Sequence, residues 1–116
     1  MAVVYAVQNP HWRDRDTGEF VPKYDLSSCE EFGELRFVLG PRTQLSDTEK
    51  VLDEIEDSLE GFCGDDFLLL IGNPVLIAIA ALVAGDRTNR LGFLVWNRNQ
   101  RGYEPVHVDL GEFDED

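Results

Sequence analysis

The sequence predicts an α/β domain with a small three-layer, mainly parallel sheet of about five strands and an antiparallel hairpin at its C-terminal edge. Two observations carry this prediction. Residues 2–8 (AVVYAVQ) and 66–71 (DFLLLI) are nearly unbroken apolar runs, which are typical of strands buried on both faces. Helical patterns then separate the later strands, and alternating strands and helices favour right-handed crossovers in one sheet.

The length fits one domain, 1–110, followed by an acidic tail, 111–116. The expected strands span residues 2–8, 35–39, 66–71, 91–96 and 103–110. Because the first and third strands are the most apolar, we place them side by side in the centre, which gives the strand order 2-1-3-4-5. Residues 9–34 are expected to be mostly loop, with a helical turn or two at 28–32.

The first helix is expected to begin at Ser46 and to end near residues 61–64. The stretch Ser46-Asp47-Thr48-Glu49 has the spacing of a capping box. Apolar side chains then recur at helical spacing, as Leu52, Ile55, Leu59 and Phe62. The helix is therefore amphipathic.

The second helix is expected over residues 74–84. Gly72-Asn73-Pro74 supplies a turn, a capping asparagine and a proline at the first helical position, where its missing N–H costs nothing. The helix is apolar all round, which predicts that it is covered on most sides, and Gly85 is expected to end it.

The last two strands are expected to form the edge hairpin, joined by the polar residues 97–102. Alternation of Val106, His107, Val108 and Asp109 indicates that one face of the second strand of this hairpin is exposed to solvent. The same edge would be the route to a homodimer.

The charge balance is strongly acidic, with 10 Lys and Arg against 23 Asp and Glu, a formal net charge of -13. Such a chain repels nucleic acid and anionic membranes, so neither is expected as a direct partner. Adaptation to concentrated salt, which screens self-repulsion, explains the same composition and stays open as an alternative. With no basic and apolar leader and no apolar stretch long enough for a bilayer, we expect a cytoplasmic protein.

No cofactor or metal is expected. Cys29 and Cys63 lack CxxC spacing and are most simply reduced core or near-core residues. The phosphate-loop, dinucleotide and hydrolase motifs do not occur. His11 beside Trp12 in a loop, and His107 on an edge strand, are poor candidates for proton transfer, so a non-enzymatic role is favoured.

Three strands stop at proline-containing turns: Gln8-Asn9-Pro10, Leu39-Gly40-Pro41 and Ile71-Gly72-Asn73-Pro74. In a parallel sheet these corners gather at the carboxyl edge, where α/β sheets keep their ligand crevice. Candidate ligand-binding residues there are Asn9, His11, Trp12, Arg13, Arg42 and Asn73. The alternative is that turns need Gly, Asn and Pro whatever they do, and that Arg13 to Asp16 is a self-paired surface loop.

A second candidate surface is the acidic side of the first helix. Its exposed carboxylates are expected at Asp53, Glu56, Asp57 and Glu60. A negative stripe of this kind could occupy a basic groove on a protein partner. A merely solvated helix face is the alternative.

Several segments carry a resemblance to a known group: Asn9-Pro10-His11-Trp12, Lys23 to Ser27, Phe32 to Leu35, and residues 66–84. They resemble short proteins of bacterial and archaeal viruses and proviruses that have no assigned activity. The resemblance implies a viral origin and transfers no catalytic residue. It favours an acidic binding protein acting on a host or viral macromolecule in the host cytosol. The alternative is a domain, possibly an enzyme, that handles a small anionic ligand or nucleotide at the carboxyl-edge crevice.

Overall fold

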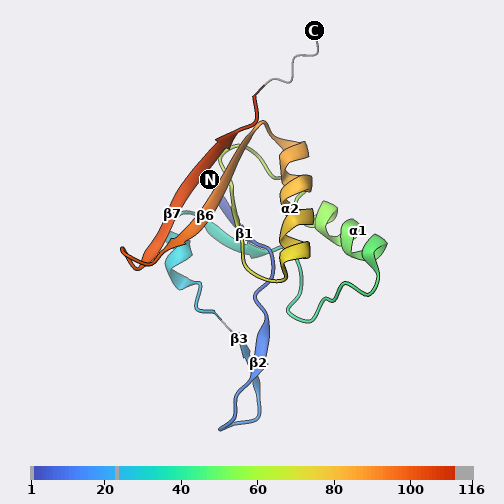
Figure 1. The fold of residues 1–116 in the computed structure, drawn as a ribbon, viewed down its shortest axis with the longest axis vertical. Helices are drawn as coiled ribbons and strands as arrows, with labels where there is room; N and C mark the ends of the chain where they lie inside the picture. The colour runs from blue at the N-terminus through green and yellow to red at the C-terminus, as the bar shows by residue number, and fades with distance from the viewer. Residues whose placement is uncertain (1, 23, 112–116) are drawn as a thin grey trace.

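The computed structural model describes residues 2–22 and 24–111, and it contains the predicted α/β architecture (Figure 1). Within the described residues, the main sheet has five strands in the order β4-β1-β5-β6-β7, which is the predicted order 2-1-3-4-5. Its strands are β1 (Val3–Ala6), β4 (Glu34–Phe37), β5 (Phe67–Leu69), β6 (Arg90–Asn97) and β7 (Gly102–Asp109). The predicted acidic tail lies outside the described residues apart from Gly111.

The strand pairings follow the apolar pattern. The central strand β1 pairs in parallel with β4 on one side and with β5 on the other. Strand β5 pairs in parallel with β6, and β6 pairs antiparallel with β7 over their whole length. The predicted edge hairpin is therefore confirmed.

Helix α1 (Thr48–Ser58) begins later than the sequence indicates. The capping residue is Asp47, whose side chain accepts a hydrogen bond from the Lys50 N–H at 3.2 Å, so the choice of Ser46 was wrong by one residue. Val51 and Ile55 face the core, whereas Leu52, expected in the apolar stripe, is exposed.

Helix α2 (Pro74–Arg87) begins as predicted, with the Asn73 side chain accepting a hydrogen bond from the Val75 N–H at 2.8 Å. It continues past Gly85, where the sequence suggested an end. The expectation that most of its sides are covered holds only in part, because one stripe along the helix is exposed. Leu76, Ala80, Val83 and Ala84 are buried, but Leu82 is 76% exposed and Val75 is 51% exposed.

The two faces of the sheet carry different layers. Both α-helices lie on one face, where Ile55 and Leu59 pack with Tyr5, Leu68 and Leu76. The other face is covered by the short 3-10 helix η1 (Ser27–Glu31), close to the helical turn expected at 28–32. There Cys29 packs with Val4, Leu69 and Leu94. The third layer is thus thin.

At the amino-terminal ends of the parallel strands, Asp66 links β1 to the segment that precedes β5. Its two carboxylate oxygens accept hydrogen bonds from the Val3 N–H at 2.9 Å and the Cys63 N–H at 3.0 Å. Asp66 is buried, and these backbone N–H groups compensate for the burial of its carboxylate. Cys29 is buried, whereas Cys63 is exposed and is neither a core nor a near-core residue, which corrects the expectation for that thiol.

Two further strands form a feature that the sequence did not indicate. Strands β2 (His11–Arg13) and β3 (Phe20–Pro22) pair antiparallel as a separate two-stranded sheet within a stretch expected to be loop. This hairpin, residues 11–22, projects away from the main body and is called the arm below (Figure 1). Among the described residues, no helix is both long and apolar enough to cross a lipid bilayer.

Candidate functional site

The three proline corners meet around one residue, Gln8, at the carboxyl edge of the sheet. The Gln8 N–H donates to the Ile71 carbonyl at 3.1 Å, and the Leu39 N–H donates to the Val7 carbonyl at 3.0 Å. The Gln8 side-chain amide donates to the carbonyls of Gly40 and Thr43, at 2.8 and 2.9 Å. One buried glutamine therefore joins the ends of β1, β4 and β5.

Asn9 then closes the base of the arm. Its side-chain amide donates to the Tyr24 carbonyl at 2.9 Å, and its side-chain oxygen accepts from the Tyr24 N–H at 3.2 Å. This reciprocal pair imitates one rung of a β-ladder and holds together two segments 15 residues apart. The His11 ring nitrogen Nδ1 lies 3.2 Å from the Asn9 carbonyl. The arm therefore leaves the body from a fixed position.

The arm carries aromatic rings and arginines. Phe20 is half-exposed, with the Arg42 guanidinium carbon 4.9 Å and the Arg13 guanidinium carbon 5.6 Å from its ring centroid. Both distances are within the range of a cation–π contact. Trp12 pairs with Val21 in the register, so it lies on the opposite face of the arm from Arg13, and it is 57% exposed.

A shallow cavity of about 430 Å³ lies beside the base of the arm. It brings together two of the predicted ligand-binding residues, Asn9 and His11, with the corner at Gly40 and Pro41. Its remaining walls are apolar, formed by Pro22, Phe37, Val38 and Leu39.

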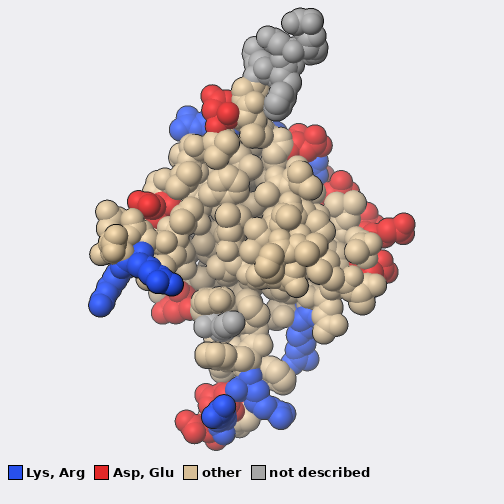
Figure 2. Space-filling view, in the orientation of Figure 1, with Lys and Arg blue, Asp and Glu red and all other residues tan. Residues whose placement is uncertain are grey.

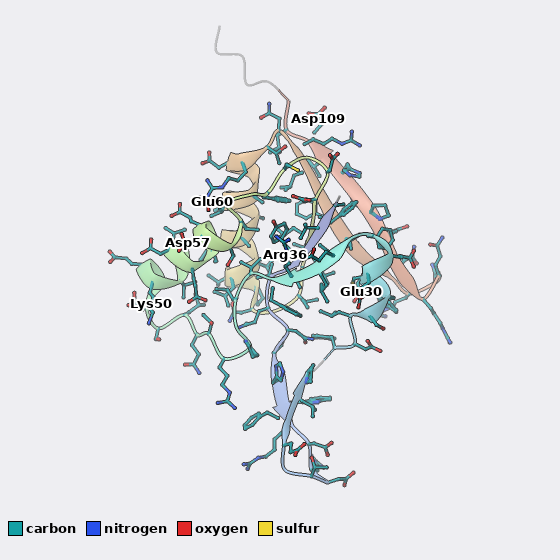
Figure 3. The ribbon with its side chains drawn as sticks, turned by 180° about the vertical axis from the view of Figure 1, so that it is seen from behind. Glu30, Arg36, Lys50, Asp57, Glu60 and Asp109 are labelled. Carbon is teal, nitrogen blue, oxygen red and sulfur yellow. The ribbon has the colours of Figure 1, made fainter. Side chains whose placement is uncertain are left out.

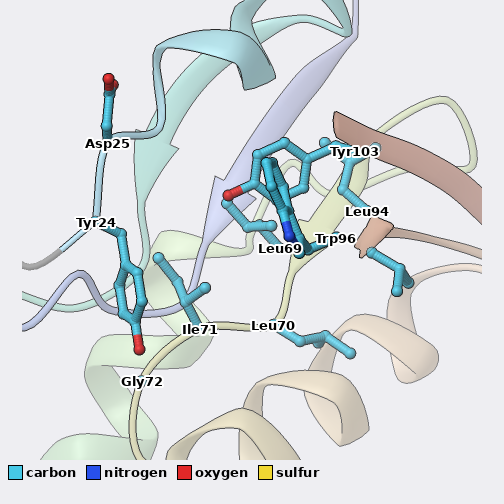
Figure 4. A pocket seen from close by; sticks show the side chains of 10 residues that line it. Tyr24, Asp25, Leu69, Leu70, Ile71, Gly72, Leu94, Trp96 and Tyr103 are labelled. Atoms are coloured by element: carbon cyan, nitrogen blue, oxygen red, sulfur yellow. The ribbon is translucent and has the colours of Figure 1, made fainter. Parts of the chain in front are cut away.

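A second cavity, of about 500 Å³, opens at the carboxyl ends of β5 and β6 (Figure 4). Leu69 and Leu94 lie at its floor, while Tyr24, Trp96 and Tyr103 bring aromatic rings to its walls. Trp96 and Tyr103 pack edge to face, with ring centroids 5.1 Å apart. Burial, with the nearby Cys29 thiol, raises the pKa of Tyr103 to about 12. Local sequence patterns do not indicate this cavity, because its walls come from distant segments.

The remaining predicted residues lie elsewhere. The Asn73 side chain caps α2, and Asn73 lines neither cavity. The four predicted acids, Asp53, Glu56, Asp57 and Glu60, are all exposed. Only the first three lie on α1, because the helix ends at Ser58, earlier than the expected end near 61–64, and leaves Glu60 in the turn that follows. Figure 3 shows Asp57 on α1 and Glu60 just beyond its end, in a part of the molecule separate from the arm. The arm and the acidic helix are thus two different surfaces.

Sequence reasoning missed Gln8, Phe20, Tyr24 and Tyr103, and it considered Trp96 only as part of a dimer face on the edge hairpin. A signal for Phe20 was present, because Asp16-Thr17-Gly18 separates two short stretches with aromatic and β-branched residues. Gly18 adopts a φ of 74°, as a tight turn requires. Trp96 and Tyr103 form a cross-strand pair that follows from the register of the hairpin.

One comparison with known proteins decides the family. The model of the family described as "Phage Pam3 gp32-like protein" matches residues 2–110, almost the whole chain. The chain belongs to this phage family. The resemblance to short viral proteins is thereby confirmed. No curated protein and no solved structure is similar enough to count as a match.

Proposed function

We propose that this member of the phage family is a non-enzymatic binding protein that docks on a host or viral protein through the arm. The observation that carries the proposal is the arm itself. It projects from the body and exposes Trp12 and Phe20, with Arg13 and Arg42 stacked on the phenylalanine. Tryptophan and arginine are the side chains that most often dominate binding energy at protein interfaces.

The charge distribution favours a protein over a nucleic acid as the partner. The net charge of -13 opposes approach to a phosphate backbone. Within the arm, Asp14, Asp16 and Glu19 also outnumber Arg13 and Arg15. The acidic side of α1 would add long-range attraction for a basic partner, so association should slow as salt rises.

Site-specific photocrosslinking tests the proposal in infected host cells. A photoreactive phenylalanine analogue at position 12 should give an adduct of discrete mass with one protein. The matched control is position 65, which is exposed at the amino-terminal end of β5, away from the carboxyl edge that carries the arm. Absence of an adduct at position 12, or the same adducts from both positions, would contradict the proposal.

A second candidate function rests on the two arginines. Among the described residues the only ion pair within 4.0 Å joins Arg36 and Glu34, so Arg13 and Arg42 present guanidinium groups without a carboxylate partner. Two such groups on the same Phe20 ring could hold a small anion such as a nucleotide or a phosphorylated metabolite.

Thermal shift distinguishes the two candidates. If the arginines hold a small anion, nucleotides or inorganic phosphate should raise the melting temperature. Arg42→Ala should abolish the rise, whereas Arg98→Ala, in the β6–β7 turn, should retain it. A rise that survives Arg42→Ala would remove this second candidate.

A further inference from the structure

The outer side of α2 and the neighbouring side of the β6–β7 hairpin expose apolar residues. We call them together the apolar face, and they are Val75, Ala78 and Leu82 of α2, Val95 of β6, and Val106 and Val108 of β7. Figure 2 shows a broad expanse without charged side chains over this part of the molecule, with acidic and basic side chains at its periphery. Soluble proteins seldom leave such an expanse uncovered unless it binds something.

The strand register shows why this face is open. Val106 lies directly opposite Phe93, and Val108 lies opposite Leu91. Leu91 and Phe93 belong to the core beneath the helices, and directly opposed residues share one face of a sheet. The two valines therefore point to the helical side, yet they remain 40% exposed because α1 and α2 do not extend over β7.

The composition of α2 leads to the same conclusion. The helix is apolar all round up to Gly85, a pattern typical of helices buried on most sides. In the described structure, its inner side packs on the sheet, but Leu82 has the greatest exposure of the large apolar residues. A further element beside α2 and over β7 would complete the helical layer and cover both regions.

The charges next to the apolar face specify the kind of element. Glu104 lies on the same side of β7 as Val106, and Asp86 follows Leu82 by one helical turn. Arg98 and Arg101 lie beyond this stretch, in the turn between β6 and β7. With the net charge of -13, these acids favour basic residues on whatever binds here.

We propose that the apolar face is the docking site of an amphipathic helix from a partner protein, with an apolar stripe flanked by lysine or arginine. Helices recognised in this way place apolar side chains spaced three or four residues apart against the receiving surface. The helix would lie beside α2 and over the β6–β7 hairpin. This interface is separate from the arm and goes beyond the function proposed for it.

A second copy of the chain is a less suitable occupant. Each copy carries the same strong negative charge, so two copies repel at moderate salt. Pro105 also removes an N–H group from the middle of the edge strand β7, which disfavours pairing of two such edges. The homodimer expected through this edge therefore becomes an outcome of the test.

The test measures binding of fluorescent peptides to the full chain by anisotropy. Three peptides have the 14-residue length of α2: a leucine stripe with lysine flanks, the same stripe with glutamate flanks, and a scrambled lysine version. We expect the lysine-flanked stripe to bind roughly tenfold tighter than the other two peptides. Added salt should reduce its advantage in affinity over the glutamate-flanked peptide.

Variants locate the binding site. Leu82→Gln combined with Val106→Thr should weaken binding of the lysine-flanked peptide about tenfold. Both side chains are exposed, so circular dichroism should show an unchanged fold. Leu52→Gln, at an exposed leucine on α1, and Trp12→Ser, on the arm, should leave affinity unchanged. The Trp12 variant keeps this result independent of the function proposed for the arm.

Three results would overturn the proposal. Equal binding of the scrambled peptide would remove the need for a helical stripe, and full binding by the double variant would place the site elsewhere. Sedimentation showing a dimer that the double variant loses would assign the face to a second copy.

Discussion

The two faces of the sheet are covered to very different depths. On the helical face, α1 and α2 pack Ile55, Leu59 and Leu76 against Tyr5 and Leu68. On the opposite face, the five-residue helix η1 supplies Cys29 above Val4 and Leu94. The larger cavity opens beside this thin layer, with walls from Tyr24 and Tyr103. The comparison indicates that the helical face carries most of the stability, while the thin face leaves room for a site.

The largest effect is expected from Ile55→Ala on the helical face. Ile55 is fully buried between α1 and the sheet, and truncation leaves a cavity that two packed helices cannot readily fill. We expect a loss of about 3–4 kcal/mol in the free energy of unfolding, measured by urea denaturation. Leu52→Ala, on the exposed side of the same helix, is the matched control and should cost less than about 1 kcal/mol.

A smaller loss is expected from Leu26→Ala on the thin face. Leu26 is buried next to η1 and packs with Cys29 and Leu69. Because η1 is short and lies at the surface, it can move into the space, so about 2 kcal/mol should be lost in the same urea experiment. A loss equal to that of Ile55→Ala would show that the two faces contribute alike.

Alkaline pH should destabilise the fold through Tyr103, beside the thin face. Burial raises the pKa of Tyr103 to about 12 from its ordinary 10, so the folded state holds the phenolic proton more tightly than the unfolded chain. The unfolded state then binds fewer protons between pH 10 and 12, and stability falls over this range.

Urea midpoints measured from pH 9 to 12 check this prediction. Tyr103→Phe should show a shallower decline than the wild type. Part of the decline should remain in that variant, because burial also raises the pKa of Tyr5. Parallel profiles for the two proteins would count against a buried Tyr103 phenol.

The smallest effect is expected in thiol labelling of the two cysteines. Exposed Cys63 should react at once with a disulfide reagent at neutral pH. Cys29 should react slowly, because it is buried and burial raises the pKa of its thiol. A Cys63→Ser variant leaves Cys29 as the only thiol to be labelled. If the thin face opens first, Cys29 should be labelled faster than the amide hydrogens of α1 exchange with solvent.

Much of the fold could be predicted from the sequence because burial leaves a direct mark on composition. The two apolar runs identified the central strands β1 and β5, and Asn73-Pro74 marked the start of α2. The choice of Ser46 over Asp47 failed because both residues can cap a helix, and geometry decides between them. The open side of α2 was missed because periodicity shows that residues are apolar, not what covers them.

Less of the candidate site could be predicted. The arm has only three residues in each strand, too few for alternation to stand out, and a side-chain pair between Asn9 and Tyr24 closes its base. Arg13 and Arg42 were correctly named as a local group, but their meeting point, Phe20, was not. The larger cavity depends on contacts between segments far apart in the chain, which local patterns do not report.

The geometry around Gln8 makes the carboxyl edge dependent on the length of one side chain. Its amide reaches Gly40 and Thr43, while Gly72, at a φ of 119°, passes so close that an added β-carbon would lie 3.0 Å from the β-carbon of Gln8. Asparagine is one methylene shorter, and glutamate cannot donate to either carbonyl when ionised. Glutamine is thus the side chain that is long enough to span this gap and can donate two hydrogen bonds at its end. The spacing of the loops after three strands therefore depends on the length of the Gln8 side chain.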